Sequence, residues 1–352
     1  MAEKMMVKGN EAMAEAAIRA GCRLYFGYPI TPQSEFTEYM ARRMPEVNGV
    51  FLQSESEVAA VNMVYGAACT GYRVMTSTSS PGYSLMQEGV SYIAGARLPA
   101  VFVNVVRGGP GLGDIQPAQS DYFQATKGGG HGDYHLIVLA PGTIQESVDL
   151  MESAFRMADT YRTPVLVLVD GMLGQMMEPV TFPDFLELKD LHDHSEWALR
   201  GAAGRNPNKV TSFDIDPVIL EKMNNVIHNV YEEIKKSEIR YEMNSMEDAE
   251  YVLVGYGTMG RILTSVVRMA RKKGIKAGLF RPITLWPFPY KQLKDAVRGK
   301  KSVLTVEMSK GQMVEDVRLA VEGASPVHFY GRTGGMVPTP DEVLTELVRI
   351  IG

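Results

Sequence analysis

The chain has 352 residues, enough for two domains of ordinary size, each with its own core. Apolar residues make up 45% and charged residues 22%, which is typical of a globular protein and excludes a disordered or fibrous one. The net charge of −5 gives no reason to expect a nucleic-acid partner. No uncharged stretch approaches the roughly 20 residues that span a bilayer, so we expect no membrane segment and a cytoplasmic protein.

The first half of the chain alternates helical and extended patterns, which predicts βα units and a largely parallel sheet covered on both faces. Helices are expected over residues 10–21, 32–44, 56–71, 83–96 and 144–162. Strands are expected over residues 23–29, 47–53, 73–79, 99–106, 136–141 and 163–171. This first α/β domain is predicted to occupy residues 1–177.

Residues 178–249 are rich in Pro, Gly and Asn, which indicates a connecting segment, with one charged helix over residues 217–237. A second α/β unit follows. Its strands are expected at residues 250–257, 275–282, 301–308 and 326–332, with helices at 258–274, 313–323 and from about Pro340. The second domain is therefore predicted to occupy residues 250–352.

Cysteine is scarce. Only Cys22 and Cys69 are present, too few for a disulfide framework or a Cys-rich metal site. A [4Fe–4S] cluster normally needs four cysteine ligands, so the chain is not expected to hold one by itself.

Residues 53–60 read QSESEVAA and place two carboxylates at the start of a small-residue, apolar helix. Ser54 and Glu57 fit the S-x-x-E pattern of a capping box, in which the serine caps the helix and the glutamate bonds back to the cap amide. Glu57 is followed by Ala59 and Ala60, by Gly66 nine residues on, and then by a strand ending in TSTSSPG at residues 76–82.

That order resembles the pyrimidine-binding domain of thiamine diphosphate enzymes. Further motifs narrow the resemblance to the alpha subunit of 2-oxoacid:ferredoxin oxidoreductases, nearest the branched-chain 2-oxoisovalerate type. They are KGNEAMAEAAIRAG, GYPITPQSE, TSSPGYSLMQEG, the run from RGGPG to QSD, and FRPITLWPFP in the second half. The resemblance runs through nearly the whole chain and implies a pyrimidine-type parallel-sheet domain followed by a transketolase C-terminal-like α/β domain.

The resemblance also implies roles for individual residues. Glu57 would hydrogen-bond N1′ of the aminopyrimidine, so that the 4′-imino group can remove the thiazolium C2 proton. Glu55 is the competing carboxylate, but Glu57 is preferred because its nine-residue spacing to Gly66 matches the family. Ser80 and Gly82, in the TSSPG motif, are expected at the cofactor.

Thr31 in YPITPQS and Arg107 in VVRGGPG are the expected substrate-binding residues. From the residues alone, Thr31 is a turn residue before Pro32 and Arg107 a surface cation at a strand end. By resemblance, both face the 2-oxo acid, with the Arg107 guanidinium pairing with its carboxylate. Both follow predicted strands, at the edge where open α/β sheets bind ligands. The glycines of residues 108–113 match no Walker motif and indicate a lid or a plain loop.

The sequence contains no G-D-G motif, with which thiamine enzymes usually hold Mg²⁺ and the cofactor diphosphate. We therefore expect no metal site in this chain and a beta-type partner subunit that supplies the diphosphate and Mg²⁺ half. Gamma and ferredoxin-like subunits would carry the iron–sulfur clusters, with ferredoxin as electron acceptor and coenzyme A as acyl acceptor. The sequence leaves isovalerate-like, pyruvate-like and 2-oxoglutarate-like acids open as substrates.

Two alternatives remain at this point. Gly255, Gly257 and Gly260 form a G-x-G-x-x-G pattern between a strand and a helix, which is typical of dinucleotide binding. Roughly 20 residues on stands Arg281 rather than an acid, so this alternative is an NADP-dependent dehydrogenase. The other alternative is a non-catalytic paralogue that keeps the fold.

Overall fold

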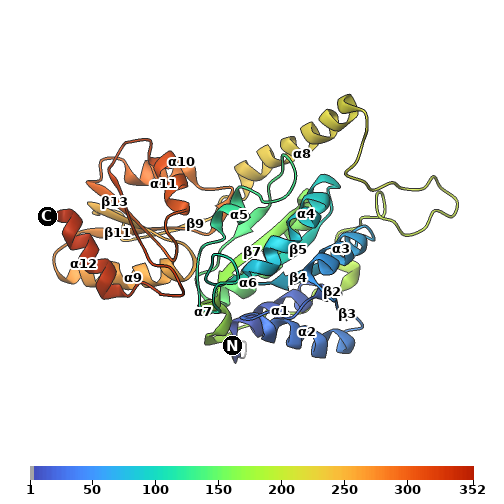
Figure 1. Ribbon diagram of the computed structural model, residues 1–352, viewed down its shortest axis with the longest axis horizontal. Coiled ribbons are helices and arrows are strands. Elements are labelled where there is room, and N and C mark those ends of the chain that lie inside the picture. Colours follow the sequence, from blue (N-terminus) through green and yellow to red (C-terminus); the bar gives the residue numbers. More distant parts are fainter. Residues whose placement is uncertain (1–3) are drawn as a thin grey trace.

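Two separate sheets organise the chain, in a computed structural model that describes residues 4–352 (Figure 1). The first has seven strands in the order β12-β6-β7-β5-β4-β2-β3, of which all but β12 are parallel. Their bounds are β2 Leu24–Gly27, β3 Val50–Gln53, β4 Val74–Thr78, β5 Ala100–Val106, β6 Ile137–Leu139, β7 Pro164–Asp170 and β12 Thr284–Trp286. Every residue of β4, β5, β6 and β7 is buried, as expected for the central strands of a parallel sheet covered on both faces.

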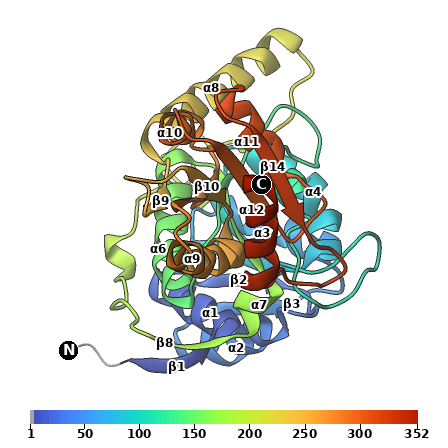
Figure 2. The same cartoon turned by 90° about the vertical axis from the view of Figure 1, so that its left-hand side faces the viewer.

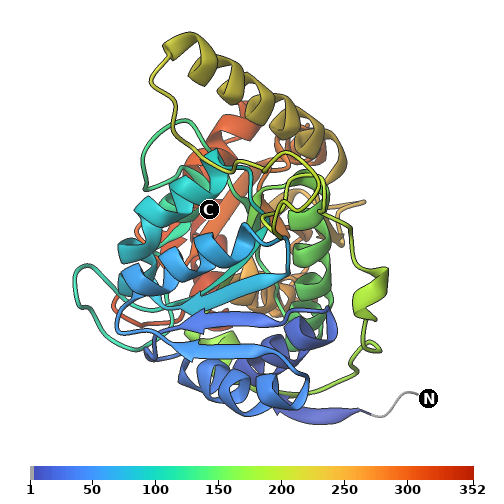
Figure 3. The ribbon, with the colours of Figure 1, turned by 90° about the vertical axis from the view of Figure 1, so that its right-hand side faces the viewer.

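Helices cover both faces of the first sheet, as the view in Figure 3 shows. On one face, α1 (Gly9–Arg19) packs against both α2 (Ser34–Glu46) and α6 (Ile144–Tyr161). On the other face, α3 (Glu57–Ala68) packs against α4 (Ser80–Gly95). The short helices α5 (Tyr122–Thr126) and α7 (Gly171–Gln175) follow β5 and β7. The predicted parallel α/β domain is confirmed.

A small antiparallel ribbon lies beside the first sheet and pairs β1 (Met5–Lys8) with β8 (Met177–Val180) (Figure 2). The chain then passes through the single-turn helix η1 (Leu188–Asp190) to the long helix α8 (Pro217–Ser237). No helix among residues 4–352 is both long and apolar enough to cross a bilayer.

The second sheet has five strands in the order β14-β13-β10-β11-β9. Its strands are β9 Tyr241–Asn244, β10 Tyr251–Val254, β11 Ala277–Pro282, β13 Ser302–Glu307 and β14 Val327–Gly331. Its helices are α9 Gly257–Lys272, α10 Tyr290–Val297, α11 Met313–Val321 and α12 Pro340–Ile351. Helix α9 packs with α12, and α10 packs with α11.

Two edge strands, β9 and β12, lie outside the strands expected from the sequence. Strand β12 lies between β11 and α10 in the chain, yet it pairs with β6 of the first sheet. Strand β9 lies in the segment predicted to be a connection, yet it pairs with β11 of the second sheet. The two domains are therefore joined by the hydrogen bonds between β12 and β6 as well as by the connecting segment of the chain.

A buried carboxylate, Asp316 on α11, fastens the two domains together. It accepts hydrogen bonds from the hydroxyls of Tyr122 and Tyr290, and the Lys127 ammonium contacts both of its oxygens at 2.6 and 2.8 Å. Nearby, Gln312 bonds the backbone of Phe123 and of Ser120. The segment after β5 is thereby held against the start of α11.

Asp316→Ala is expected to lower the free energy of unfolding by about 2 kcal/mol, because it leaves the buried Tyr122 hydroxyl and the Tyr290 hydroxyl without their acceptor. Urea denaturation measures the change. Asp295→Ala serves as the control, since Asp295 pairs with Arg298 at the surface and its loss should cost less than about 1 kcal/mol. Equal losses of stability in the two variants would contradict the assignment of Asp316 as a residue that holds the two domains together.

Candidate active site

The residues singled out in the sequence follow adjacent strands of the first sheet. Thr31 comes after β2, Glu57 after β3, Ser80 and Gly82 after β4, and Arg107 after β5. These four strands are parallel neighbours in the order β5-β4-β2-β3. All five residues therefore lie at the carboxyl edge of one sheet, where open α/β folds bind ligands.

The start of α3 differs from the predicted capping box. The cap is Ser56, whose Oγ accepts from the Ala59 amide at 3.2 Å, so Glu57 is the first helical residue. Ser54 instead extends β3, since both its amide and its hydroxyl donate to the Gly27 carbonyl. The capping-box prediction is wrong, and the Glu57 carboxylate is not used in capping.

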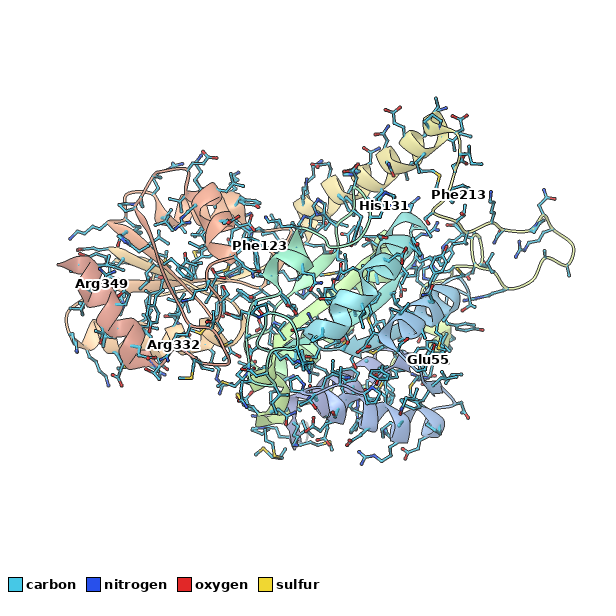
Figure 4. All side chains as sticks on the ribbon, in the orientation of Figure 1. Glu55, Phe123, His131, Phe213, Arg332 and Arg349 are labelled. Carbon is cyan, nitrogen blue, oxygen red and sulfur yellow. The ribbon has the colours of Figure 1, made fainter. Side chains whose placement is uncertain are left out.

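Glu57 is buried but unpartnered. Its side chain is 5% exposed, and within residues 4–352 no donor or cation bonds its carboxylate. Glu55 is exposed and lies on the outer side of the first domain, as Figure 4 shows. Of the two candidate carboxylates, Glu57 is therefore the buried one and Glu55 the exposed one.

The other buried carboxylates of the described chain are all paired. They are Glu15, Asp159, Asp170, Glu238, Glu307 and Asp316. Glu307, for example, accepts from three successive amides at the start of α11 and from the Ser309 hydroxyl. Unlike these six, the Glu57 carboxylate has no hydrogen-bond donor within residues 4–352.

Gly82 leaves room for this carboxylate. A Cβ at position 82 would stand 2.5 Å from Glu57 Oε1 and closer still to Thr78 Oγ1, so any side chain there would push the glutamate away. Ser80, at the start of α4, accepts a hydrogen bond from the Arg107 amide at 3.0 Å. It thereby ties the end of β5 to the helix that carries Gly82.

Arg107 is a buried cation without an anion. Its side chain is 8% exposed, Nη1 donates to the Thr31 carbonyl at 2.9 Å and Nη2 to the Leu112 carbonyl at 3.2 Å. Nε is buried and unpaired, and no carboxylate of residues 4–352 forms a salt bridge with it. The carbonyls fix the plane of the guanidinium and leave its charge free for a carboxylate ligand.

Two cavities flank the segment that follows Arg107. One of about 400 Å³ lies between the domains and is lined by Ser80, Arg107 and residues 108–111 on one side and by Ser309, Lys310 and Gln312 on the other. The other, of about 660 Å³, is lined by the Thr31 side chain and by Ile115, Met172, Met176 and Val337. Thr31 and Arg107 meet through the Thr31 carbonyl, but their side chains line different cavities.

Two residues of the interdomain cavity were not singled out by sequence reasoning. Burial raises the pKa of Asp121, while hydrogen bonds from Ser80 and Asn104 oppose that shift. Lys310 is exposed at the cavity wall and has no salt-bridge partner in the described residues. Asp121 ends the QSD motif and so had a sequence signal, whereas Lys310 enters only through the docking of the second domain.

The glycine-rich loop between β10 and α9 is packed rather than open. Gln119 donates to the Tyr256 carbonyl, and the space left beside Gly257 is about 10 Å³, no more than a single water molecule needs (about 10–15 Å³). Arg281 packs on Gly260 and is paired with Glu146 and Glu242. The loop has no room for a dinucleotide in this structure.

Comparison with known proteins agrees with this geometry. Residues 15–249 match the family described as pyruvate flavodoxin/ferredoxin oxidoreductase, thiamine diphosphate-binding, and residues 249–343 match pyruvate:ferredoxin oxidoreductase core domain II. The chain is 48% identical over 347 residues to a ketoisovalerate oxidoreductase subunit VorB of Methanothermobacter marburgensis, covering 99% of this chain and 98% of the relative. It is 36% identical to a 2-oxoglutarate synthase subunit KorA of Methanothermobacter thermautotrophicus, covering 99% and 100%.

Solved structures share the fold. A 2-oxoglutarate:ferredoxin oxidoreductase from Magnetococcus marinus superposes with a TM-score of 0.87 at 24% identity, covering all of this chain and 66% of that one. A split-gene transketolase superposes with a TM-score of 0.61 at 14% identity, covering 97% of both chains. The resemblance and the fold class inferred from the motifs are confirmed, and the chain belongs to the 2-oxoacid:ferredoxin oxidoreductase family as its alpha-type, thiamine diphosphate-binding subunit.

Proposed function

We propose that this subunit takes part in the oxidative decarboxylation of a branched-chain 2-oxo acid, 3-methyl-2-oxobutanoate, to its acyl-coenzyme A, with electrons passed to ferredoxin. The observation that carries the proposal is that Glu57 and Arg107, two buried residues of opposite charge at one sheet edge, form no salt bridge within the described chain. A carboxylate that lacks a donor and a guanidinium that lacks an anion are suited to a heterocyclic cofactor and a 2-oxo acid, respectively.

The residues present fit the aminopyrimidine end of thiamine diphosphate. The free Glu57 acceptor matches its protonated ring nitrogen, and Gly82 leaves the space in which the two can meet. When bound, the cofactor would supply the carbon nucleophile that decarboxylation of a 2-oxo acid requires. Glu57, at the first turn of α3, would hold a proton at that ring nitrogen.

The site is proposed to be completed by a partner. Val58, Leu85 and Tyr92 are exposed apolar side chains on the two helices that begin at Glu57 and Ser80. A methyl group added at Gly66, on the same face of α3, would meet no atom of this chain within 4 Å, so the chain itself does not require a glycine there. A beta-type subunit on this face would bring the diphosphate and Mg²⁺ half, and further subunits the iron–sulfur clusters. A cytoplasmic location is part of this proposal.

The substrate assignment rests on the cavity beside Thr31. Apolar side chains line it, namely Ile115, Met172, Met176 and Val337, and its charged residue is Glu35. A branched aliphatic chain suits this apolar part of the lining. The greater identity to the ketoisovalerate oxidoreductase subunit than to the 2-oxoglutarate synthase subunit supports the same choice.

Anaerobic assay of the complex purified with its native partners tests the proposal. We expect kcat/KM for 3-methyl-2-oxobutanoate to exceed that for 2-oxoglutarate by about 10-fold or more, the range that an apolar pocket provides. The isolated chain should show no decarboxylation. Activity of the isolated chain, or a preference for 2-oxoglutarate, would contradict the proposal, and tight NADPH binding would restore the dehydrogenase alternative.

Gly82→Ala is expected to weaken thiamine diphosphate binding by at least about 10-fold in the complex, because the added methyl would displace the Glu57 carboxylate. Quenching of intrinsic fluorescence on cofactor titration measures this. The control is Asp295→Ala, a surface substitution on α10 that lies outside the proposed site. If Gly82→Ala binds the cofactor as tightly as the unmodified protein, the space beside Gly82 is not used as proposed.

A further inference from the structure

A third cavity lies at the opposite edge of the first sheet, remote from the proposed active site. It has a volume of about 260 Å³ and is lined by Arg23 and Arg73, the residues directly before β2 and β4. Its outer wall is the segment 188–194 together with Arg200. At about 30 Å³ per water molecule in the liquid, the cavity has the volume of several waters or of one small organic anion.

The charges that line this cavity do not cancel. The cationic side chains are Arg23, Arg73, Lys189 and Arg200, and the acidic ones are Asp159 and Asp193. Asp159 is already occupied: one oxygen accepts from Arg73 Nε at 2.8 Å and the other contacts His194 Nε2 at 3.2 Å. Asp193 is engaged by the amide and hydroxyl of Ser195.

Arg23 is the cation of this cavity that has a hydrogen-bond donor without an acceptor. Its Nη1 donates to the carbonyls of Ile18 and Cys22, both at 2.8 Å, while its Nε is buried and has no partner. Burial lowers the pKa of its guanidinium, and Arg23 forms no salt bridge in the described chain. Lys189 and Arg200 likewise form no salt bridge within residues 4–352.

The wall that carries these groups is tied to the domain at a few points. Leu199 donates to the Cys69 carbonyl, Arg200 Nε donates to the Thr70 carbonyl, and Leu186 donates to the Arg19 carbonyl. Between these points the segment spans the amino ends of the strands. A ligand that bonds both Arg23 at the sheet edge and Lys189 on the covering segment would hold this segment against the sheet.

We infer that this cavity binds a phosphate-type oxyanion, free or carried on a small metabolite, between Arg23 of the sheet edge and Lys189 of the covering segment. Guanidinium groups match such oxyanions through paired N–H donors, and the low-dielectric wall strengthens the attraction. The site is separate from the proposed cofactor cleft, which lies at the carboxyl edge of the same sheet.

Isothermal titration of the purified complex with inorganic phosphate, and separately with glycerol 3-phosphate, tests the inference, with chloride at equal ionic strength as the blank. Saturable binding is expected, and Arg23→Gln should weaken it by at least about 10-fold. Tighter binding of the ester than of phosphate would identify a metabolite-borne phosphate as the source, and the reverse would identify the free ion.

The matched control is Arg162→Gln. Arg162 is also partly buried, stacks on Trp197 and forms no salt bridge in the described chain, but it lies outside the cavity, so phosphate affinity should not change. Lys189→Ala, an exposed substitution that should fold normally, is expected to weaken binding by at least about 3-fold. No saturable binding, a heat equal to that of chloride, or equal affinity in Arg23→Gln and Arg162→Gln would overturn the inference.

Discussion

Glu57→Gln is expected to lower the decarboxylation rate of the complex by about 10²-fold or more, the loss typical when a positioned proton-holding group is removed. Glutamine has nearly the same shape, so the cofactor should still bind. What is lost is the negative charge that holds a proton at the ring nitrogen. Anaerobic single-turnover measurement of CO2 release, with cofactor occupancy determined in the same samples, separates the two effects.

The stability of the same variant distinguishes a functional from a structural role. Because the Glu57 carboxylate has no partner in the described chain, its neutralisation should change the free energy of unfolding by less than about 1 kcal/mol, the size of a helix-end charge effect. Glu55→Gln, exposed and two residues away, is the matched control and should keep its rate. Full activity of Glu57→Gln would remove the assignment, and a loss of stability without a loss of rate would make Glu57 a structural residue.

Arg107→Gln is expected to reduce kcat/KM for the 2-oxo acid by about 30-fold or more, corresponding to at least about 2 kcal/mol for the loss of a buried, charge-assisted contact. The effect should appear mainly in the KM of the 2-oxo acid, since the guanidinium is proposed to bind the carboxylate in the ground state as well as in the transition state. Steady-state kinetics with the 2-oxo acid and coenzyme A varied in turn measure it.

Arg107→Lys provides the control for the loop that Arg107 supports. Lysine keeps the charge but cannot bond the Thr31 and Leu112 carbonyls in one plane, so its loss in kcat/KM should be smaller than that of glutamine. An equal rise in the KM of coenzyme A would indicate a general collapse of the loop. An unchanged KM for the 2-oxo acid in Arg107→Gln would contradict carboxylate binding by this residue.

The sequence predicts at which edge of the sheet these residues lie, but not whether their side chains are paired. Each motif follows a short β-branched run, and the parallel order of such runs puts their carboxyl ends at one edge. That Glu57 and Arg107 lack partners could not be predicted, because pairing depends on residues far away in the chain. Arg107, for instance, donates to the carbonyl of Thr31, 76 residues earlier.

The wrong predictions also arise from contacts between residues that are far apart in the sequence. The cap of α3 was predicted two residues too early because Ser54 bonds Gly27 across the sheet, 27 residues away, and so remains extended. Strand β9 was not predicted because its residues are mostly exposed and show no buried apolar pattern, and β12 was not predicted because it pairs with β6, far away in the sequence. The residues that fasten the domains, such as Lys127 to Asp316, are separated by 189 positions.

The structure of the assembled complex with thiamine diphosphate bound tests the central claim most directly. The account predicts that the Glu57 carboxylate lies about 2.6–3.2 Å from the pyrimidine ring nitrogen, in a cleft closed by a partner chain over the exposed faces of α3 and α4. A pyrimidine ring held elsewhere, with Glu57 still facing Gly82 and no donor, would contradict it.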